Sequence, residues 1–153
     1  MNKILVIGGF CKDGLSYIES LKGNSEIIVV DNLQESTSLS NFTEMQMIPF
    51  QFNLLTLDQL NDLAGCFKGV DQIEVFVDRY TKYEESPSLW LADFTSFMDS
   101  LIYHIILSKL DRDKVKITLN GTFAGELSIL LGAILAFYQE NYEINFELNA
   151  NFL

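Results

Sequence analysis

Short apolar runs alternate along the chain with longer stretches in which apolar residues recur at helical spacing. Apolar runs of four to eight residues bounded by turn residues are typical of buried strands, and the helical spacing is typical of amphipathic helices. The short runs predict strands at 3–7, 26–30, 47–52, 72–77, 115–119 and 143–148. The longer stretches predict helices at 13–22, 57–67, 88–110 and 126–140.

The order of these elements indicates the fold class. Strands that alternate with helices of ten or more residues build βαβ units and a parallel sheet. Right-handed crossovers then place helices on both faces of that sheet. The length of 153 residues is room for one domain. We therefore expect an α/β fold, a Rossmann-like doubly wound parallel sheet of about six strands in a single three-layer domain over residues 1–153.

The first sixty residues bear on function. A strand that ends in glycine, a helix, and a second strand that ends in an acid form the pattern of dinucleotide-binding βαβ units. The first glycine makes the tight turn, the third lets helix and strand pack closely, and the acid binds the ribose hydroxyls. Gly8 and Gly14 fit the first and third roles, and Asp31 ends the second predicted strand. Since a carboxylate repels a 2′-phosphate, a bound dinucleotide should be NAD.

These segments resemble the short-chain dehydrogenase/reductase superfamily, especially its extended, NAD-dependent epimerase/dehydratase-like branch, in a truncated and degenerate form. Residues 4–9 (ILVIGG) resemble the opening strand of that branch, residues 29–33 (VVDNL) its second strand, and residues 141–146 the lead-in to its sixth. In that branch an Asp usually caps the adenine where this chain has Asn53. The cofactor-binding residues that the resemblance implies are Gly8, Gly9, Gly14, Asp31, Asn32 and Asn53.

The glycine motif departs from that branch. The pattern there is Gly-x-x-Gly-x-x-Gly, whereas this chain has Cys11 between Gly8 and Gly14. A side chain at Cys11 obstructs the approach of the backbone to a pyrophosphate. Asp13 either caps the helix or repels the phosphates that a helix N-terminus otherwise attracts. The sequence therefore leaves open whether a dinucleotide still binds.

The catalytic pair of the superfamily is missing. Its chemistry uses a Tyr as general acid or base and a Lys four residues later that lowers the pKa of the Tyr. None of the six tyrosines has a Lys at that spacing, and no Lys or Arg follows Lys116. If Tyr138 were the catalytic Tyr, the residue four positions later would be Tyr142 rather than a Lys, and the site would have no cation. Thr122 keeps a hydroxyl where the catalytic Ser would be, as a relic. We expect no catalytic residues and no enzyme activity of the chain by itself.

Composition and charge exclude several other functions. The net charge of −11 argues against binding to nucleic acids or anionic membranes. Two cysteines, Cys11 and Cys66, and the single His104 are too few for a zinc site or a disulfide framework. His104 lies among apolar residues, which favours a core or interface position. No leader and no run long enough for a bilayer is apparent, so we expect a cytoplasmic protein without a metal.

The helices predicted at 88–110 and 126–140 are apolar around most of their circumference. A helix that covers a sheet in a monomer needs one polar face. In the superfamily the two corresponding helices form a four-helix bundle with a partner subunit. We therefore expect a homodimer, or a heteromer with a catalytic relative, through these two helices, with anchors at Phe97, Ile134 and Phe137.

The leading interpretation is a non-catalytic subunit of this superfamily's fold that retains weak NAD binding. Two alternatives remain open. One is an NAD(H)-dependent oxidoreductase with an atypical active site that uses Thr122. The other is a nucleotide-sensing regulator that binds NAD(H) through the glycine turn and Asp31 without turnover.

Overall fold

A computed structural model describes residues 2–9, 12–21, 23, 25–31, 46–49, 64–76, 87–121 and 125–149. Its centre is a sheet in the order β3-β2-β1-β4-β5-β6, and every neighbouring pair is parallel. The doubly wound parallel fold is confirmed, with the first strand in the interior of the sheet. The strands are β1 (Asn2–Ile7), β2 (Ser25–Asp31), β3 (Gln46–Pro49), β4 (Gln72–Phe76), β5 (Lys116–Asn120) and β6 (Phe146–Asn149).

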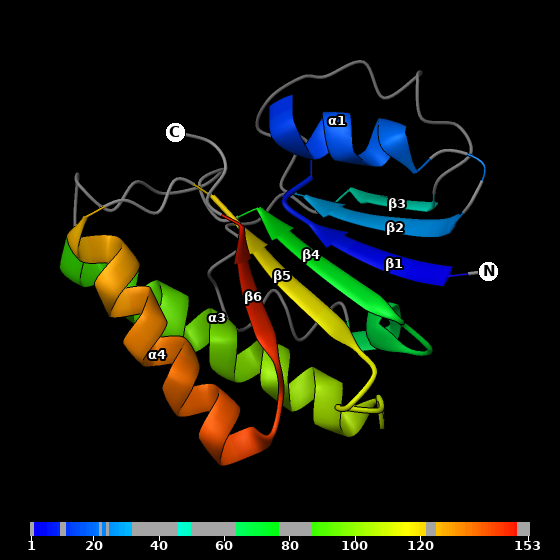
Figure 1. Cartoon of the computed structure of the whole chain (residues 1–153). Coiled ribbons are helices and arrows are strands. Elements are labelled where there is room, and N and C mark those ends of the chain that lie inside the picture. Colours follow the sequence, from blue (N-terminus) through cyan, green and yellow to red (C-terminus); the bar gives the residue numbers. More distant parts are fainter. Residues whose placement is uncertain are drawn as a thin grey trace.

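Helices cover both faces of the sheet, which gives three layers (Figure 1). Helix α1 (Lys12–Ser20) lies over one face, and α3 (Pro87–Leu107) and α4 (Glu126–Tyr142) lie side by side on the other. Of the helix predicted at 57–67, only the short 3₁₀ helix η2 (Ala64–Phe67) falls among the described residues.

Several predicted boundaries are wrong by two or three residues, among them the end of α1 at Ser20 rather than at residue 22. Backbone geometry explains two of these differences. Helix α3 ends at Leu107 rather than at Leu110 because Lys109 takes a left-handed conformation with φ 55°. Helix α4 continues past residue 140 to Tyr142, where Glu143, with φ 56°, ends it and donates its N–H to the carbonyl of Gln139. The sixth strand begins at residue 146 rather than 143.

The core consists of two clusters separated by the sheet. Ile4 and Val6 of β1 point toward α1 and pack with Ile18. Leu5 and Ile7 point to the opposite face and join the larger cluster with α3 and α4. Since successive strand residues alternate between faces, β1 is apolar on both sides, as the sequence predicts.

The strands β4, β5 and β6 differ from this pattern. Their residues on the α3–α4 side are apolar and buried in the larger cluster: Ile73, Val75, Ile117, Leu119 and Phe146. The residues between them therefore face the α1 side. Most of these are polar: Gln72, Glu74, Lys116, Thr118, Asn120, Glu147 and Asn149. This half of the sheet thus has one apolar face and one polar face, rather than two apolar ones.

Candidate nucleotide-binding site

The turn after β1 has the geometry that the glycine pattern predicts. Gly8 has φ 75°, a conformation that favours glycine. Its N–H donates a hydrogen bond of 2.7 Å to the carbonyl of Val30, which ties the turn to the end of β2. The chain therefore reverses sharply at the carboxyl end of a central strand, which is where parallel α/β sheets bind ligands.

Gly14 and Gly9 bring helix α1 against this turn. A Cβ on Gly14 would overlap the carbonyl oxygen of Gly9 and lie 2.8 Å from its Cα. A Cβ on Gly9 would lie 2.7 Å from Cγ1 of Val6 and 3.1 Å from Cδ1 of Ile18. Only glycine fits at position 14 without a shift of the backbone, so Gly14 has the packing role of the third glycine in a dinucleotide-binding turn.

Asp31 ends β2 beside this turn. Ile7 pairs with Val30 in the sheet, so Asp31 lies one residue beyond the partner of the last residue of β1. The structure thus brings Gly8, Gly9, Gly14 and the backbone of Asp31 to one corner of the carboxyl edge. The other predicted residues, which are Cys11, Asn32, Asn53 and Thr122, lie outside the described residues.

Asp13 is an exposed residue in the first turn of α1, at the helix N-terminus where dinucleotide-binding turns hold the pyrophosphate. Since α1 begins at Lys12, Asp13 lies within the helix, so its interpretation as the helix cap is wrong. A carboxylate in the first turn stabilises the helix through the macrodipole. The same charge disfavours a pyrophosphate at this N-terminus.

The structure also shows a chain of polar side chains that the sequence analysis missed. Nε2 of Gln72 donates to the hydroxyl of Tyr17 (2.8 Å) and to Oε1 of Glu74 (2.7 Å). Nδ2 of Asn120 donates to Oε2 of Glu74 (2.9 Å), and Nδ2 of Asn149 donates to Oδ1 of Asn120 (2.9 Å). These residues link α1, β4, β5 and β6 on the polar half of the sheet face.

Glu74 is the ionisable centre of this polar chain, with 6% of its surface exposed. Burial raises the pKa of Tyr17 well above its usual range, and the negative charge of Glu74 raises it further. Tyr17 therefore remains a neutral phenol at physiological pH. The sequence did contain a signal for these polar contacts, since polar residues occupy alternate positions of three successive strands. Strands that are buried by apolar contacts on both faces are instead nearly continuous apolar runs.

Tyr138 is not placed as a catalytic tyrosine would be. Tyr138 is a buried residue whose hydroxyl donates to Oδ1 of Asp99 at 2.8 Å and lies 3.4 Å from the carbonyl oxygen of Thr95. Burial first, and then the Asp99 carboxylate, raise the pKa of Tyr138 well above its usual range. Position 138 lies twelve residues into α4, or about 18 Å from its start at the carboxyl edge. Tyr138 joins α4 to α3 instead.

His104 and Cys66 belong to the interior. His104 is buried on α3, and its ring stacks on Phe67 with the ring centroids 4.9 Å apart. Burial raises the pKa of the Cys66 thiol, which disfavours the reactive thiolate form. Among the described residues, no group of His, Cys, Asp and Glu could hold a metal ion. No helix in the same ranges is long and apolar enough to cross a membrane.

The sides of α3 and α4 that point away from the sheet carry exposed apolar residues. Of the large apolar side chains that the structure describes as exposed, one, Leu148, lies on β6. The other six are Leu89, Tyr103, Ile106 and Leu107 on α3 and Ile129 and Phe137 on α4. We call the surface formed by these six residues, with Ala92 and Asp99 on α3 and Gly132, Ala133 and Ala136 on α4, the outer helical face.

Of the three anchors predicted for an interface, only Phe137 is exposed. Phe97 is fully buried in the core with none of its surface exposed, so its assignment as an anchor is wrong. Ile134 is partly buried and packs against the same core. Ile129, with 76% of its surface exposed, lies on the outer helical face and was not selected from the sequence.

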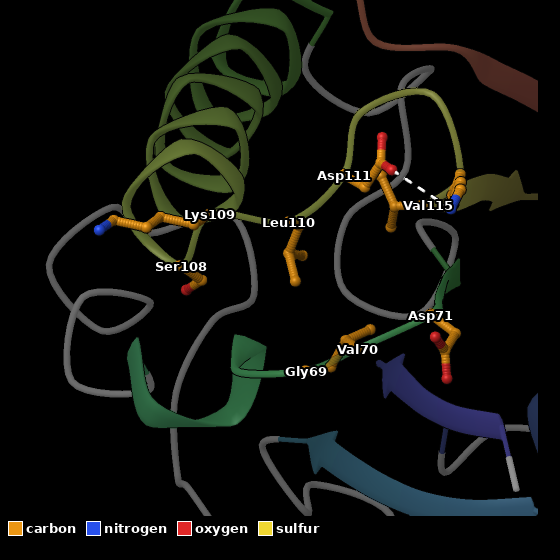
Figure 2. Close-up of a pocket in the computed structure, with 9 residues that line it drawn as sticks. Gly69, Val70, Asp71, Ser108, Lys109, Leu110, Asp111 and Val115 are labelled. Carbon is orange, nitrogen blue, oxygen red and sulfur yellow. Dashed lines mark ion pairs between the residues drawn. The ribbon is translucent and has the colours of Figure 1, made fainter.

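A cavity of about 270 Å³ lies at the opposite, amino edge of the sheet (Figure 2). It lies between the segment that leads into β4 and the segment that joins α3 to β5. Both signs of charge line it, and the ion pair of Lys114 with Asp111 (3.8 Å) lies at its wall. None of the residues predicted from the sequence to bind a ligand lines this cavity.

Comparisons with known proteins bear on the fold. No family model and no curated protein matches the sequence. Among solved structures, the chain is similar to the UDP-glucose 4-epimerase from Brucella ovis in complex with NAD, with 15% identity and a TM-score of 0.67. The match covers 97% of this chain and 51% of that one.

Two further solved structures give the same result. The UDP-glucose 4-epimerase from Thermotoga maritima with UDP-glucose has 14% identity and a TM-score of 0.69, over 95% of this chain and 54% of that one. A yeast methylglyoxal/isovaleraldehyde reductase complexed with NADPH has 14% identity and a TM-score of 0.66, over 95% and 52%. The chain thus spans about half the length of these structures. At the level of the fold, these similarities agree with the resemblance inferred from the sequence: the chain has a Rossmann-like fold similar to that of these epimerases and this reductase.

Proposed function

We propose that the chain is a non-catalytic subunit that associates through its outer helical face, with a second copy or with a catalytic relative. The observation that carries this proposal is the concentration of exposed apolar side chains on α3 and α4. On monomeric proteins, apolar surface residues are mostly scattered, and a contiguous patch marks an interaction site.

The energetics favour burial of this surface. Each Å² of apolar surface removed from water contributes about 25 cal/mol before the costs of association. Ile129 and Phe137, with 76% and 57% of their surfaces exposed, are large enough to act as anchors. Gly132 lies between them, and a Cβ added there would meet no atom within 4 Å. Small residues between two large ones allow a partner helix to approach closely.

The non-catalytic part of the proposal rests on the residues of the chain. It contains no Tyr with a Lys four residues later, which is the pair that the resembling superfamily uses. Tyr138, the remaining candidate, lies in the second half of α4 and donates its hydroxyl hydrogen to Asp99 of α3. No described side chain replaces that pair at the carboxyl edge beside Gly8.

The experiment is to compare the native assemblies of three purified proteins by light scattering and native mass spectrometry. The unmodified chain should appear in a complex, either with itself or with a partner retained from its own cells. Ile129→Glu combined with Phe137→Glu should abolish the complex and leave a folded monomer, because both side chains are exposed. Ser16→Glu on α1 is the control, since it adds a charge to an exposed helix on the other face. A monomeric unmodified chain without any partner would refute the proposal.

A second candidate function, weak NAD binding without turnover, is favoured by the turn geometry. Gly8 has a left-handed conformation, and Gly14 packs against Gly9 with no room for a side chain. Asp31 ends the neighbouring strand, where an acid binds ribose hydroxyls in dinucleotide sites. A subunit of this kind would sense the dinucleotide or stabilise itself with it, and calorimetric titration with NAD tests this function.

A further inference from the structure

The two helices of the outer helical face carry charge of only one sign. Helices α3 and α4 together contain Asp93, Asp99, Glu126 and Glu140, and none of the 10 Lys and Arg of the chain lies in either. Asp99, Glu126 and Glu140 are exposed. The outer helical face, as defined above, therefore contains apolar residues and one acid, Asp99, and neither of its helices contributes a Lys or Arg.

Asp99 lies in the middle of this surface on α3. Six residues recur every three or four positions along one side of α3, each exposed or half-exposed, and Asp99 is the acid among these six: Leu89, Ala92, Ser96, Asp99, Tyr103 and Ile106. The hydroxyl of Tyr138 donates to one carboxylate oxygen of Asp99 at 2.8 Å and holds the group in place. Within the described ranges, no Lys or Arg pairs with Asp99.

A second copy would be a poor match for this surface. In a two-fold symmetric contact each copy presents the same residues to the other. The acids of α3 and α4 would then meet apolar residues or acids, and neither helix would supply an opposite charge. Burying a carboxylate without a positive partner is costly, and opposing like charges across an interface adds to that cost.

We propose that the partner of the outer helical face is a different chain that presents an Arg or Lys side chain to Asp99. This inference rests on the proposed function and selects one of its two partners. The carboxylate oxygen that Tyr138 does not contact accepts the hydrogen bond from the cation, and the apolar residues on either side exclude water from the pair. Because Asp99 is already held by Tyr138, little side-chain freedom is lost when the pair forms.

The test uses a charge-reversed copy of the chain as the cationic probe. Sedimentation velocity at micromolar concentration would compare the unmodified chain, Asp99→Arg, and an equal mixture of the two. The mixture should associate at least tenfold more tightly than either protein alone, and high salt should weaken this association because it screens the charge pair. Asp113→Arg, which reverses an exposed acid outside both helices, is the matched control and should not associate with the unmodified chain.

Asp99→Asn is the second variant, and it keeps an oxygen to accept the hydrogen bond from Tyr138. It should self-associate more tightly than the unmodified chain because the like charges are gone. If the unmodified chain forms a dimer whose dissociation constant Asp99→Asn leaves unchanged, a second copy is the partner. This inference is then overturned while the proposed function stands. If the mixture with Asp99→Arg does not associate, this inference also fails. The proposed function is then judged separately by the double variant of Ile129 and Phe137 in the complex from cells.

Discussion

Nδ2 of Asn120 lies 2.9 Å from Oε2 of Glu74 and donates a hydrogen bond that joins β5 to β4. Gln72 donates to the other carboxylate oxygen, Oε1, at 2.7 Å. A buried carboxylate is tolerated when both of its oxygens accept hydrogen bonds. Glu74 therefore stabilises the polar half of the sheet face because both of its carboxylate oxygens accept hydrogen bonds, which a side chain with a single acceptor atom could not do.

Glu74→Gln tests the contribution of this carboxylate to stability. The new amide nitrogen would face either Gln72 or Asn120, both of which donate, so one hydrogen bond is lost. We expect the free energy of unfolding in urea to fall by about 2 kcal/mol. Glu26→Gln on β2, an exposed position, is the control and should change it by less than about 0.5 kcal/mol. Equal effects of the two variants would contradict a role for the polar chain.

Two glycine-to-alanine substitutions in helices should have opposite effects. Gly14→Ala forces a Cβ onto the carbonyl of Gly9 and should destabilise the fold by about 1–3 kcal/mol, the usual cost of overpacking. Gly132→Ala meets no atom within 4 Å and should stabilise α4 by about 1 kcal/mol through helix propensity. Thermal unfolding of both variants measures the difference. If the Gly14→Ala protein were as stable as the unmodified chain, α1 and the turn at Gly9 would be less closely packed than the structure shows.

Stability should fall in alkaline solution because of two tyrosines, the half-buried Tyr17 and the buried Tyr138. Burial, together with Glu74 beside Tyr17 and Asp99 beside Tyr138, raises the pKa of each above the ordinary value of 10.0. The folded state therefore keeps these protons to a higher pH than the unfolded state. Their contribution is complete below about pH 10 and is lost as the pH rises above it.

Urea unfolding between pH 8 and about pH 11 would measure this loss. Tyr138→Phe should make the fall in stability above about pH 10 less steep, since one of the two groups is removed. Tyr103→Phe, which removes an exposed tyrosine of α3, is the matched control. A free energy of unfolding that is constant across this pH range would contradict the raised pKa values of Tyr17 and Tyr138.

Asp31 should select NAD over NADP if a dinucleotide binds. Its carboxylate would accept hydrogen bonds from the ribose hydroxyls and repel a 2′-phosphate. Calorimetry should show tighter binding of NAD, and Asp31→Ala should weaken it by about tenfold or more, the value of a hydrogen bond to a charged group. Equal or tighter binding of NADP by the unmodified chain would contradict this prediction.

The purified chain should show no oxidoreductase turnover with NAD(H) and small carbonyl or alcohol substrates. General acid–base catalysis contributes about 10²–10⁴-fold to such reactions, and the Tyr and Lys that would supply it are missing. Absorbance of the reduced nicotinamide measures hydride transfer directly. Robust turnover that disappears in Thr122→Ala would establish an enzyme with an atypical active site instead.

The alternation of strands and helices, and with it the parallel sheet, and the glycine turn could be predicted because they depend on local features. Gly8 follows the end of β1 and Asp31 ends β2, whereas Gly14 lies in the first turn of α1. The apolar run of β1 is typical of any buried parallel strand. The end of α3 could not be predicted, because the left-handed conformation of Lys109 has no signature in a residue type that rarely adopts it.

Which side of α3 faces the sheet could also not be predicted from the sequence. A helix that is apolar almost all round gives no direction for its inner side, so Phe97 was assigned to an interface although it lies in the core. The polar chain through Glu74 was missed for a related reason. Its members lie on three strands and on α1, and only the register of the sheet brings Gln72, Asn120 and Asn149 together.

The parallel pairing of every described strand has a consequence for how the chain folds. No two neighbouring strands can form a local hairpin, and β1 pairs with β4 only after Ile4 meets Gln72 across the intervening chain. Closing such long loops is slow, whereas helices form within microseconds. We therefore expect helices α3 and α4 to form before the sheet that covers their inner sides, with their apolar surface exposed on every side. Refolding yield should consequently decrease as protein concentration rises, and early capture of these helices by a partner during synthesis would protect the nascent chain from aggregation.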